Sequence, residues 1–183
     1  MLLARPQTQQ FLQHLPIVCC RRHRATTRAM RAVVQRVKRA SVTIDEQVVS
    51  SIGPGLVCLI GIREGDTQAD QEHLSRKLLN FRIWPGDDGK RGWDQSVSQK
   101  QYELLLVSQF TLYALAKGNK PDYHLAMPPQ RAKDFYLSFL ERVRREYVAE
   151  RVKDGIFGAM MDVSLVNDGP VTIQFDSEKP NGR

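Results

Sequence analysis

Two short segments of this chain bring together groups that can perform chemistry on a bound molecule. One follows directly after the apolar run 104–107 and supplies two hydroxyls and an amide, in the order Ser108, Gln109, Phe110, Thr111. The other comes about sixty residues later, in the order Asn167, Asp168, Gly169, Pro170. A buried strand that turns abruptly polar usually carries its polar groups to a rim or a cleft. We therefore expect the two segments to meet and form one site.

The Gly169-Pro170 pair has two interpretations. It is either an ordinary type I or type II turn, or a cis peptide bond at a binding rim, because cis bonds are essentially restricted to X-Pro. Glycine without a side chain lets the backbone approach a ligand closely. A carbonyl held at such a rim can bind an ammonium group while leaving no room for a wrongly placed side chain.

The hydroxyls of Ser108 and Thr111 have no evident activating base. A hydroxyl nucleophile needs a neighbouring base, and the body of the chain offers only His73, in a predicted helix, and His124, in a predicted loop. No Ser-His-Asp arrangement is predicted. The hydroxyls therefore either shape a pocket or cap strand hydrogen bonds, and the residues alone do not define a reaction.

Composition and charge exclude several classes of protein. The three cysteines form no disulfide framework and have no zinc-ligand spacing, so no metal site or cofactor is predicted. No apolar run reaches the ~18 residues that span a bilayer. The net charge is +7, but five arginines lie in residues 1–29, which leaves +2 for residues 30–183. Overall charge is thus poor support for nucleic-acid binding.

The sequence divides into an N-terminal extension over 1–29, one domain over 30–177 and a short polar tail over 178–183. The extension is rich in arginine and has no acidic residue, as in a mitochondrial or plastid transit peptide. Alternatively, it lies upstream of a true start at Met30. We expect a cytoplasmic protein, or an organellar one if the extension is a transit peptide.

Alternating and continuous apolar runs predict mostly strands in the domain. The expected strands cover 32–37, 41–44, 48–52, 56–62, 102–107, 160–166 and 171–175, with a turn at 168–170 between the last two. Helices are expected after Thr67, which has capping-box spacing to Asp70, and after Pro128-Pro129. We expect Trp93 to cover the core, and the outer arginines of the second helix (142, 144 and 145) to be solvated.

The second helix has the strongest amphipathic signal, an apolar stripe made of Ala132, Phe135, Tyr136, Phe139, Leu140 and Val143. The first repeats Leu74, Leu78 and Phe81 at helical spacing. Together the pattern predicts a compact single α/β domain, with a largely antiparallel, barrel-like or roll-like sheet and two main helices.

The two polar segments resemble the D-aminoacyl-tRNA deacylase family, also called D-tyrosyl-tRNA deacylase. The resemblance runs from 30 to about 177 and includes the segments 40–43, 117–121 and 157–159. The loop 120–128 is similar to eukaryotic members in particular. The resemblance implies a homodimeric hydrolase that cleaves the ester between a D-amino acid and the 3′ end of tRNA, a proofreading step in translation. Glycyl-tRNA mischarged on tRNA-Ala is a further expected substrate.

The resemblance also implies roles for individual residues. Gly169 and Pro170, joined by a cis bond, would hold the substrate amino group, exclude an L side chain and enter the partner subunit's pocket. Phe110 would donate its backbone N–H to the oxyanion, and Thr111 would position the substrate while the tRNA 2′-OH assists water attack; covalent catalysis by Thr111 is the alternative. Further pocket or bracing residues would be Ser108, Gln109, Asn167, Arg36, Ala126 and Met127.

Two other functions compete with this interpretation. One is a non-enzymatic nucleic-acid-binding protein on the same scaffold, which the near-neutral body disfavours. The other is a paralog that edits an L-aminoacyl-tRNA, which would be expected to relax the Gly169-Pro170 geometry and to alter the segment 108–111. Both segments are intact here, so the D-specific hydrolase is the preferred hypothesis.

Overall fold

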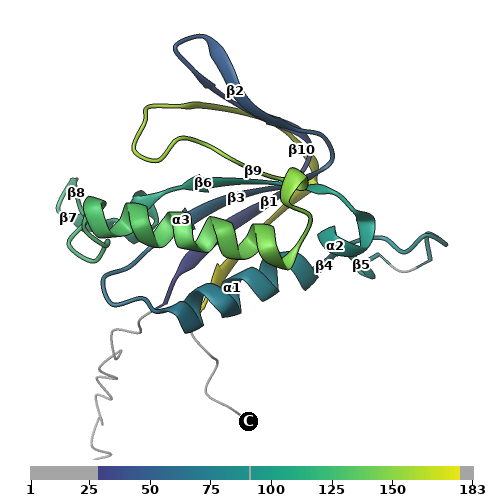
Figure 1. Cartoon of the computed structure of the whole chain (residues 1–183), viewed down its shortest axis with the longest axis horizontal. Helices are drawn as coiled ribbons and strands as arrows, with labels where there is room; N and C mark the ends of the chain where they lie inside the picture. Colours follow the sequence, from purple (N-terminus) through teal and green to yellow (C-terminus); the bar gives the residue numbers. More distant parts are fainter. Residues whose placement is uncertain (1–28, 91, 178–183) are drawn as a thin grey trace, which may run out of the picture.

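The computed structural model describes residues 29–90 and 92–177, so the predictions for the extension (except Ala29) and for the tail lie outside it. A six-stranded sheet forms the centre of the molecule (Figure 1). Its strands are β1 (Arg31–Ile44), β2 (Gln47–Ile52), β3 (Gly55–Gly61), β6 (Glu103–Ser108), β9 (Val152–Asp154) and β10 (Asp162–Asp176).

The sheet is mixed, in the order β10-β1-β3-β6-β9 with β2 also paired to β1. Strand β1 pairs antiparallel with β10, β2 and β3, whereas β3–β6 and β6–β9 are parallel. Two small antiparallel sheets lie outside it, β4 (Arg82–Trp84) with β5 (Gln95–Ser96), and β7 (Leu115–Lys117) with β8 (Lys120–Asp122). The predicted single α/β domain with a largely antiparallel sheet is confirmed.

Two long helices, α1 (Gln68–Asn80) and α3 (Pro129–Glu146), pack on one face of the sheet. The remaining helices are one turn each: α2 (Val97–Lys100), η1 (Phe110–Tyr113) and η2 (Ala149–Arg151). The predicted capping box is present, since the Thr67 amide donates to the Asp70 carboxylate at 2.8 Å. Pro129 is the first residue of α3, where the missing amide costs no helical hydrogen bond.

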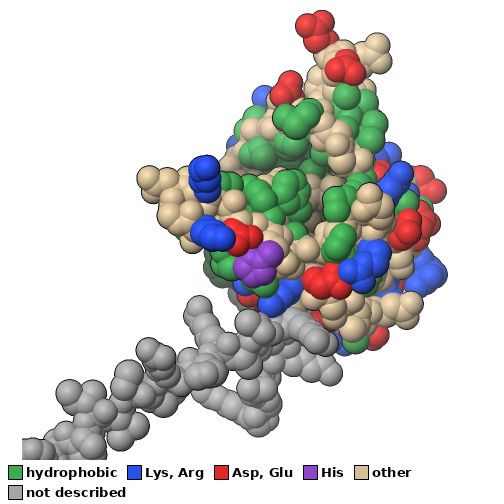
Figure 2. Space-filling model, turned by 90° about the vertical axis from the view of Figure 1, so that its left-hand side faces the viewer, with side chains coloured by type: hydrophobic (Ala, Val, Ile, Leu, Met, Phe, Trp, Pro, Cys, Tyr) green, Lys and Arg blue, Asp and Glu red, His purple; other side chains and the backbone are tan. Residues whose placement is uncertain are grey.

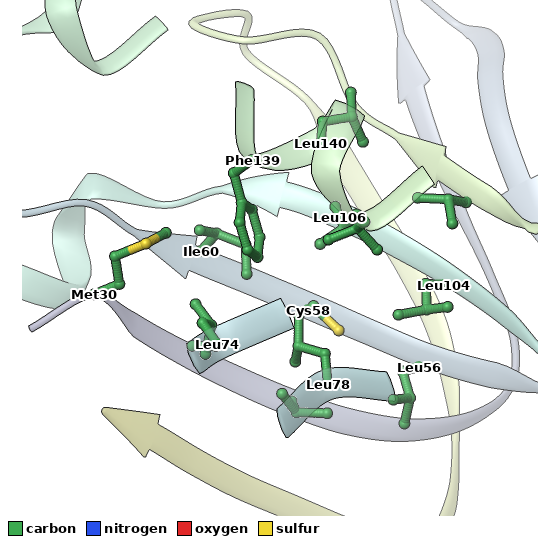
Figure 3. Close-up of a cluster of buried hydrophobic side chains, with 14 of the residues drawn as sticks. Met30, Leu56, Cys58, Ile60, Leu74, Leu78, Leu104, Leu106, Phe139 and Leu140 are labelled. Atoms are coloured by element: carbon green, nitrogen blue, oxygen red, sulfur yellow. The ribbon is translucent and has the colours of Figure 1, made fainter. Parts of the chain in front are cut away.

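The core lies between these helices and the sheet (Figure 3). Leu74 and Leu78 of α1 and Phe139 and Leu140 of α3 are at most 2% exposed, which confirms both predicted stripes. Alternate residues of the central strands complete this cluster: Leu56, Cys58, Ile60, Leu104 and Leu106. Phe81 is the exception, because it follows the end of α1, remains 38% exposed and packs edge-on against Phe175.

The opposite face of the sheet has its own apolar cluster, which contains no residue from a helix within 29–90 and 92–177. Val57, Leu105 and Val107 point to that side and pack with residues from the second half of β1, such as Val42, and with Ile52 of β2. The sheet therefore curves along the long strand β1. In Figure 1, the part of the sheet formed by β1, β2 and β10 rises above the central strands. This geometry is the predicted barrel-like roll.

The structure corrects several details of the sequence prediction. The strands expected at 32–37 and 41–44 are one continuous β1, and the predicted loop that carries His124 follows the β7–β8 hairpin. Trp93 does not cover the core but is 62% exposed. Two of the arginines expected to be solvated form ion pairs, Arg142 with Glu146 and Arg144 with Glu141 and Asp154.

Candidate active site

The polar segment after β6 folds into the single 3-10 turn η1 at the edge of the sheet. The Gln109 amide still donates to the Ile60 carbonyl of β3 at 2.7 Å, and the chain turns at the next residue. Turn η1 then packs directly on Gly61, where a Cβ atom would lie 3.0 Å from the Leu112 Cβ and 3.1 Å from the Tyr113 ring. Glycine at this position therefore allows the turn to lie close against the end of β3.

The side of η1 that faces the domain is held by several contacts. Arg31 of β1 donates to the Leu112 carbonyl at 3.1 Å, and its guanidinium lies 4.8 Å from the centre of the Tyr113 ring. Tyr113 is 1% exposed and donates its hydroxyl hydrogen bond to the Ala29 carbonyl. Burial raises the pKa of Tyr113, so the phenol stays a donor. These contacts fix the orientation of the turn within one chain.

The other side of η1 presents unpaired backbone donors. The amides of Phe110 and Thr111 are the first two of the turn, so they have no acceptor within it, and no residue of 29–90 or 92–177 accepts from them. The Phe110 side chain is 57% exposed and packs edge-on against Tyr123, with 4.9 Å between ring centres. Two successive unpaired N–H groups beside an exposed aromatic ring suit the binding of a developing oxyanion.

The Thr111 hydroxyl has an amide as its partner, not a base. It accepts a hydrogen bond from the Gln109 side chain. His124 instead lies 2.9 Å from Asp122 at the end of β8, and no hydrogen bond joins either histidine of the described domain to Thr111. The same part of the chain holds no group of side chains that could bind a metal ion. The geometry therefore agrees with a positioning role for Thr111.

Asp66 lies behind the site and was not found by sequence reasoning. Asp66 is 8% exposed. One oxygen of its carboxylate accepts a hydrogen bond from the Arg63 amide at 2.7 Å, whereas the other oxygen has no hydrogen-bond partner among the described residues. Burial is the main cause that raises the pKa of Asp66 to about 7. The charge of Asp66 also contributes, after burial, to raising the pKa of Tyr113 in η1.

Ala126 and Met127 lie next to this end of β3. The Met127 amide donates to the Ile62 carbonyl at 3.0 Å, and Ala126 forms a β-bridge with Arg63. Met127 is 9% exposed and belongs to the core cluster. The structure therefore brings both residues to the same end of the sheet as η1. Met127 contributes there mainly by packing in the core.

The Gly169-Pro170 bond is cis, in agreement with the expectation from the family resemblance. The predicted turn between two strands is wrong, because both runs pair with the same β1 as parts of one strand, β10. Gln35 pairs with Thr172, and Val37 pairs with Asn167, so four residues of β10 lie opposite the single residue Arg36. Residues 168–171 form a bulge, in which Gly169 and Pro170 are exposed.

Arg36 holds this bulge. Its guanidinium donates to the Asp168 carbonyl at 3.1 Å and pairs with the Asp168 carboxylate at 3.0 Å. It also donates to the Ile83 carbonyl of β4. Gly169 has φ +126°, and an added Cβ would lie 2.9 Å from a Val171 methyl carbon and 3.3 Å from the guanidinium. Only glycine fits this conformation without strain.

The two polar segments do not meet within one chain. Gln109 is bonded to Ile60 near the end of β3, whereas Arg36 pairs with Leu56, four residues earlier on the same strand. At ~3.3 Å per strand residue, this offset corresponds to about 13 Å along the sheet. Asn167, exposed on β10, lies with the bulge and not with η1.

The molecule is hollowed at the end that carries β7 and β8. Figure 2 views this end and shows hydrophobic side chains around a hollow, with Lys and Arg side chains on the part that projects to one side. Arg31 and Tyr123 are further residues of this region that sequence reasoning missed. Both act through contacts between distant segments, for which no spacing rule exists.

Sequence comparison agrees with this geometry. The family model described as D-Tyr-tRNA(Tyr) deacylase matches residues 33–176. A protein from Dictyostelium discoideum named D-aminoacyl-tRNA deacylase is 57% identical over 150 residues, which cover 82% of this chain and 99% of the relative. D-aminoacyl-tRNA deacylase 1 from Homo sapiens is 55% identical over 151 residues, covering 82% of this chain and 72% of that protein.

Solved structures share the fold. One titled c-Myc DNA unwinding element binding protein superposes with a TM-score of 0.77 at 55% identity, covering 82% of this chain and 99% of the other. A second, titled as a probable eukaryotic D-amino acid tRNA deacylase, has a TM-score of 0.71 at 19% identity over 81% of this chain and supports the fold alone. The chain belongs to the D-Tyr-tRNA(Tyr) deacylase family.

Proposed function

We propose that this protein hydrolyses the ester bond of D-aminoacyl-tRNA and releases the D-amino acid and free tRNA. The observation that carries the proposal is the pair of unpaired amides at Phe110 and Thr111, which lie at the start of η1 in the segment that the family resemblance assigns to the pocket. Relatives at 57% and 55% identity that are named D-aminoacyl-tRNA deacylase support the same reaction.

In the proposed mechanism, water attacks the ester carbonyl with help from the 2′-OH of the terminal adenosine. The N–H of Phe110 donates to the carbonyl oxygen as it becomes an oxyanion; such a donor is typically worth ~2.7–4 kcal/mol in the transition state. Thr111 and Gln109, hydrogen-bonded to each other, position the substrate. This assignment needs no protein base, which fits a threonine without a histidine partner.

Chirality is selected by rejection. The carbonyls of Gly169 and Pro170 hold the substrate ammonium group, so that the side chain of an L-amino acid would collide with the backbone. A D side chain points away from the backbone at this place. Glycine has no side chain to be rejected, and glycyl-tRNA mischarged on tRNA-Ala is therefore a further proposed substrate.

The site is completed by a second copy of the chain. Gly169 and Pro170 are exposed on a bulge that lies about 13 Å along the sheet from η1. In the proposed homodimer, the bulge of each subunit enters the hollow of its partner. Gly169 and Pro170 of one subunit then lie beside the η1 amides of the other. We expect the reaction in the cytoplasm, or in an organelle if residues 1–29 are a transit peptide.

A non-enzymatic nucleic-acid-binding protein is the second candidate, because one relative of known structure carries a DNA-binding title. The net charge of +2 over residues 30–183 argues against general DNA binding. An L-specific editing paralog is disfavoured because both polar segments, 108–111 and 167–170, are intact in the sequence.

Deacylation of D-Tyr-tRNA and L-Tyr-tRNA by the purified full chain tests the proposal. We expect rapid release of D-tyrosine while the L-ester remains intact. If folded protein hydrolyses neither ester, the enzyme proposal is wrong and the nucleic-acid-binding candidate replaces it. Faster hydrolysis of the L-ester would favour the editing paralog.

A further inference from the structure

The β7–β8 hairpin pairs two lysines directly opposite each other. Lys117 is the last residue of β7 and Lys120 is the first of β8, and the two are cross-strand partners at the tip of a ladder of only three residue pairs. Both side chains are exposed. Like charges directly opposite on two strands destabilise the pairing. The placement is therefore unfavourable for the isolated hairpin.

No carboxylate compensates this pair in the described domain. The ion pairs there involve other cations, and the acidic residue of the hairpin, Asp122, bonds to His124 instead. Lysine pairs of this kind suit a ligand with more than one negative charge, because each ammonium is a compact donor that binds phosphate as a point charge.

The hairpin is attached directly to the proposed active site. Turn η1 ends at Tyr113, and β7 begins two residues later at Leu115. On the return side, Tyr123 follows β8 and packs edge-on against Phe110 with 4.9 Å between ring centres. Lys120 is three residues before Tyr123, about 10 Å along an extended strand, so the lysine pair lies one hairpin length beyond the ring that packs on Phe110.

We propose that Lys117 and Lys120 bind the backbone phosphates that precede the terminal adenosine at the 3′ end of the substrate RNA. This inference rests on the proposed function and names a binding subsite for its substrate. The hairpin serves as an electrostatic contact for single-stranded RNA, and the ester is thereby guided to the η1 amides. A small ester without phosphates has nothing to bind there.

The test compares two substrates of the full-length protein and its Lys117→Ala/Lys120→Ala variant. One substrate is D-Tyr-tRNA; the other is the 3′-D-tyrosyl ester of adenosine, which has no phosphate. We expect the ratio of kcat/KM for tRNA over the adenosine ester to fall roughly tenfold to a hundredfold, mainly through KM. The dependence of log kcat/KM on log salt should become shallower by about 0.7 per lost phosphate contact.

The matched control is Arg76→Ala/Lys77→Ala, which removes two exposed neighbouring cations from the last turns of α1. In Figure 1 this end of α1 leads to β4, on the other side of the molecule from β7 and β8. The control should keep the wild-type ratio and salt slope, and Lys117→Arg/Lys120→Arg should restore most of both. Binding of deacylated tRNA is measured in parallel and should weaken only in the alanine variant of the hairpin.

If the alanine variant of the hairpin binds tRNA as wild type does and keeps the wild-type ratio of kcat/KM for the two substrates, the proposed subsite is wrong. This holds whether or not the protein hydrolyses the esters. Equal loss on both substrates would assign the lysines a structural role and would likewise contradict it. Wild-type protein that binds tRNA through the hairpin but hydrolyses neither ester would refute the proposed function and leave the subsite intact. The two proposals can thus fail separately.

Discussion

Turn η1 and the Gly169-Pro170 bulge are held in very different ways. Turn η1 is fixed from within its own domain by Gln109 on β3, by Arg31 on β1 and by the buried Tyr113 hydroxyl. The bulge interrupts the pairing of β1 with β10, and its conformation depends chiefly on Arg36. Gly169 and Pro170 project on the bulge, whereas η1 packs against Gly61 at the end of β3.

This difference indicates that the two regions have different tasks in the proposed reaction. The amides that would stabilise an oxyanion gain from being rigid before substrate arrives, because preorganised dipoles need no reorganisation during the reaction. A filter that rejects the wrong enantiomer has to be rigid as well, but it also has to reach a substrate held elsewhere. A bulge fixed by one arginine and projecting from a strand meets both requirements when a second subunit supplies η1.

The largest effect on activity is expected at Phe110, where two substitutions distinguish the role of the backbone amide from that of the side chain. Phe110→Pro removes the N–H of the first residue of the turn, a position at which proline suits the backbone. Phe110→Ala removes the ring and keeps the N–H. We expect Phe110→Pro to lower kcat on D-Tyr-tRNA about 10²–10³-fold relative to Phe110→Ala. Equal activity of the two variants, both confirmed as folded by circular dichroism, would remove the oxyanion role of this amide.

The next test loosens the bulge. Arg36→Gln removes the bonds to Asp168 and Ile83, of which the charged contacts are typically worth ~1.5–3 kcal/mol each. We expect about a tenfold to hundredfold loss of kcat/KM on D-Tyr-tRNA and a lower ratio of D to L hydrolysis. Arg39→Gln, which removes an exposed arginine from the same strand, is the control. An Arg36 variant with unchanged enantioselectivity would show that the bulge needs no brace.

A smaller effect is expected at the hydroxyl of η1. Thr111→Val keeps the shape of the side chain but loses the hydrogen bond from Gln109. If Thr111 only positions the substrate, kcat should fall less than ~10-fold, and Thr111→Ser should retain most activity. Loss of several orders of magnitude in the valine variant, together with a covalent acyl-enzyme detected by mass spectrometry, would establish Thr111 as the nucleophile instead.

The smallest expected effect is on the free energy of unfolding and arises from Asp66. Burial raises the pKa of Asp66 to about 7, so the folded state binds a proton that the unfolded state releases near pH 4. Asp66 should therefore reduce the free energy of unfolding as pH rises from about 4 to about 7. Allowing for solvent screening, we expect a loss on the order of 2 kcal/mol that Asp66→Asn abolishes.

Urea unfolding at a series of pH values measures this loss. Asp162→Asn, at an exposed carboxylate of β10, provides the comparison and should follow the wild-type pH dependence. Parallel pH profiles of wild type and Asp66→Asn would contradict the assigned pKa.

Local patterns were enough to predict the elements that position the site. The apolar stripe of α3 and the run before Ser108 were correctly assigned, because burial on one face imposes a period that the sequence records. The bulge at Gly169 was misread as a turn between strands. Both runs pair with the same β1, and pairing between distant strands leaves no local signal.

The residues that support the site were harder to predict. Arg36 is indicated only by the family resemblance, and Asp66 has no sequence signal, since its burial arises from tertiary packing. Trp93 shows the opposite error: a large aromatic residue suggested the core, yet the β4–β5 connection holds it in solvent. Such outcomes depend on tertiary packing, which overrides residue preference.

The central claim is that each active site combines η1 of one chain with the bulge of another. It is tested by mixing Phe110→Pro with Gly169→Ala, each of which should be inactive alone, and allowing subunits to exchange. Random pairing makes half of the dimers mixed, and each mixed dimer has one site with both parts intact. We predict recovery of about a quarter of wild-type D-Tyr-tRNA deacylation. No recovery, although mixed dimers form, would contradict the shared site.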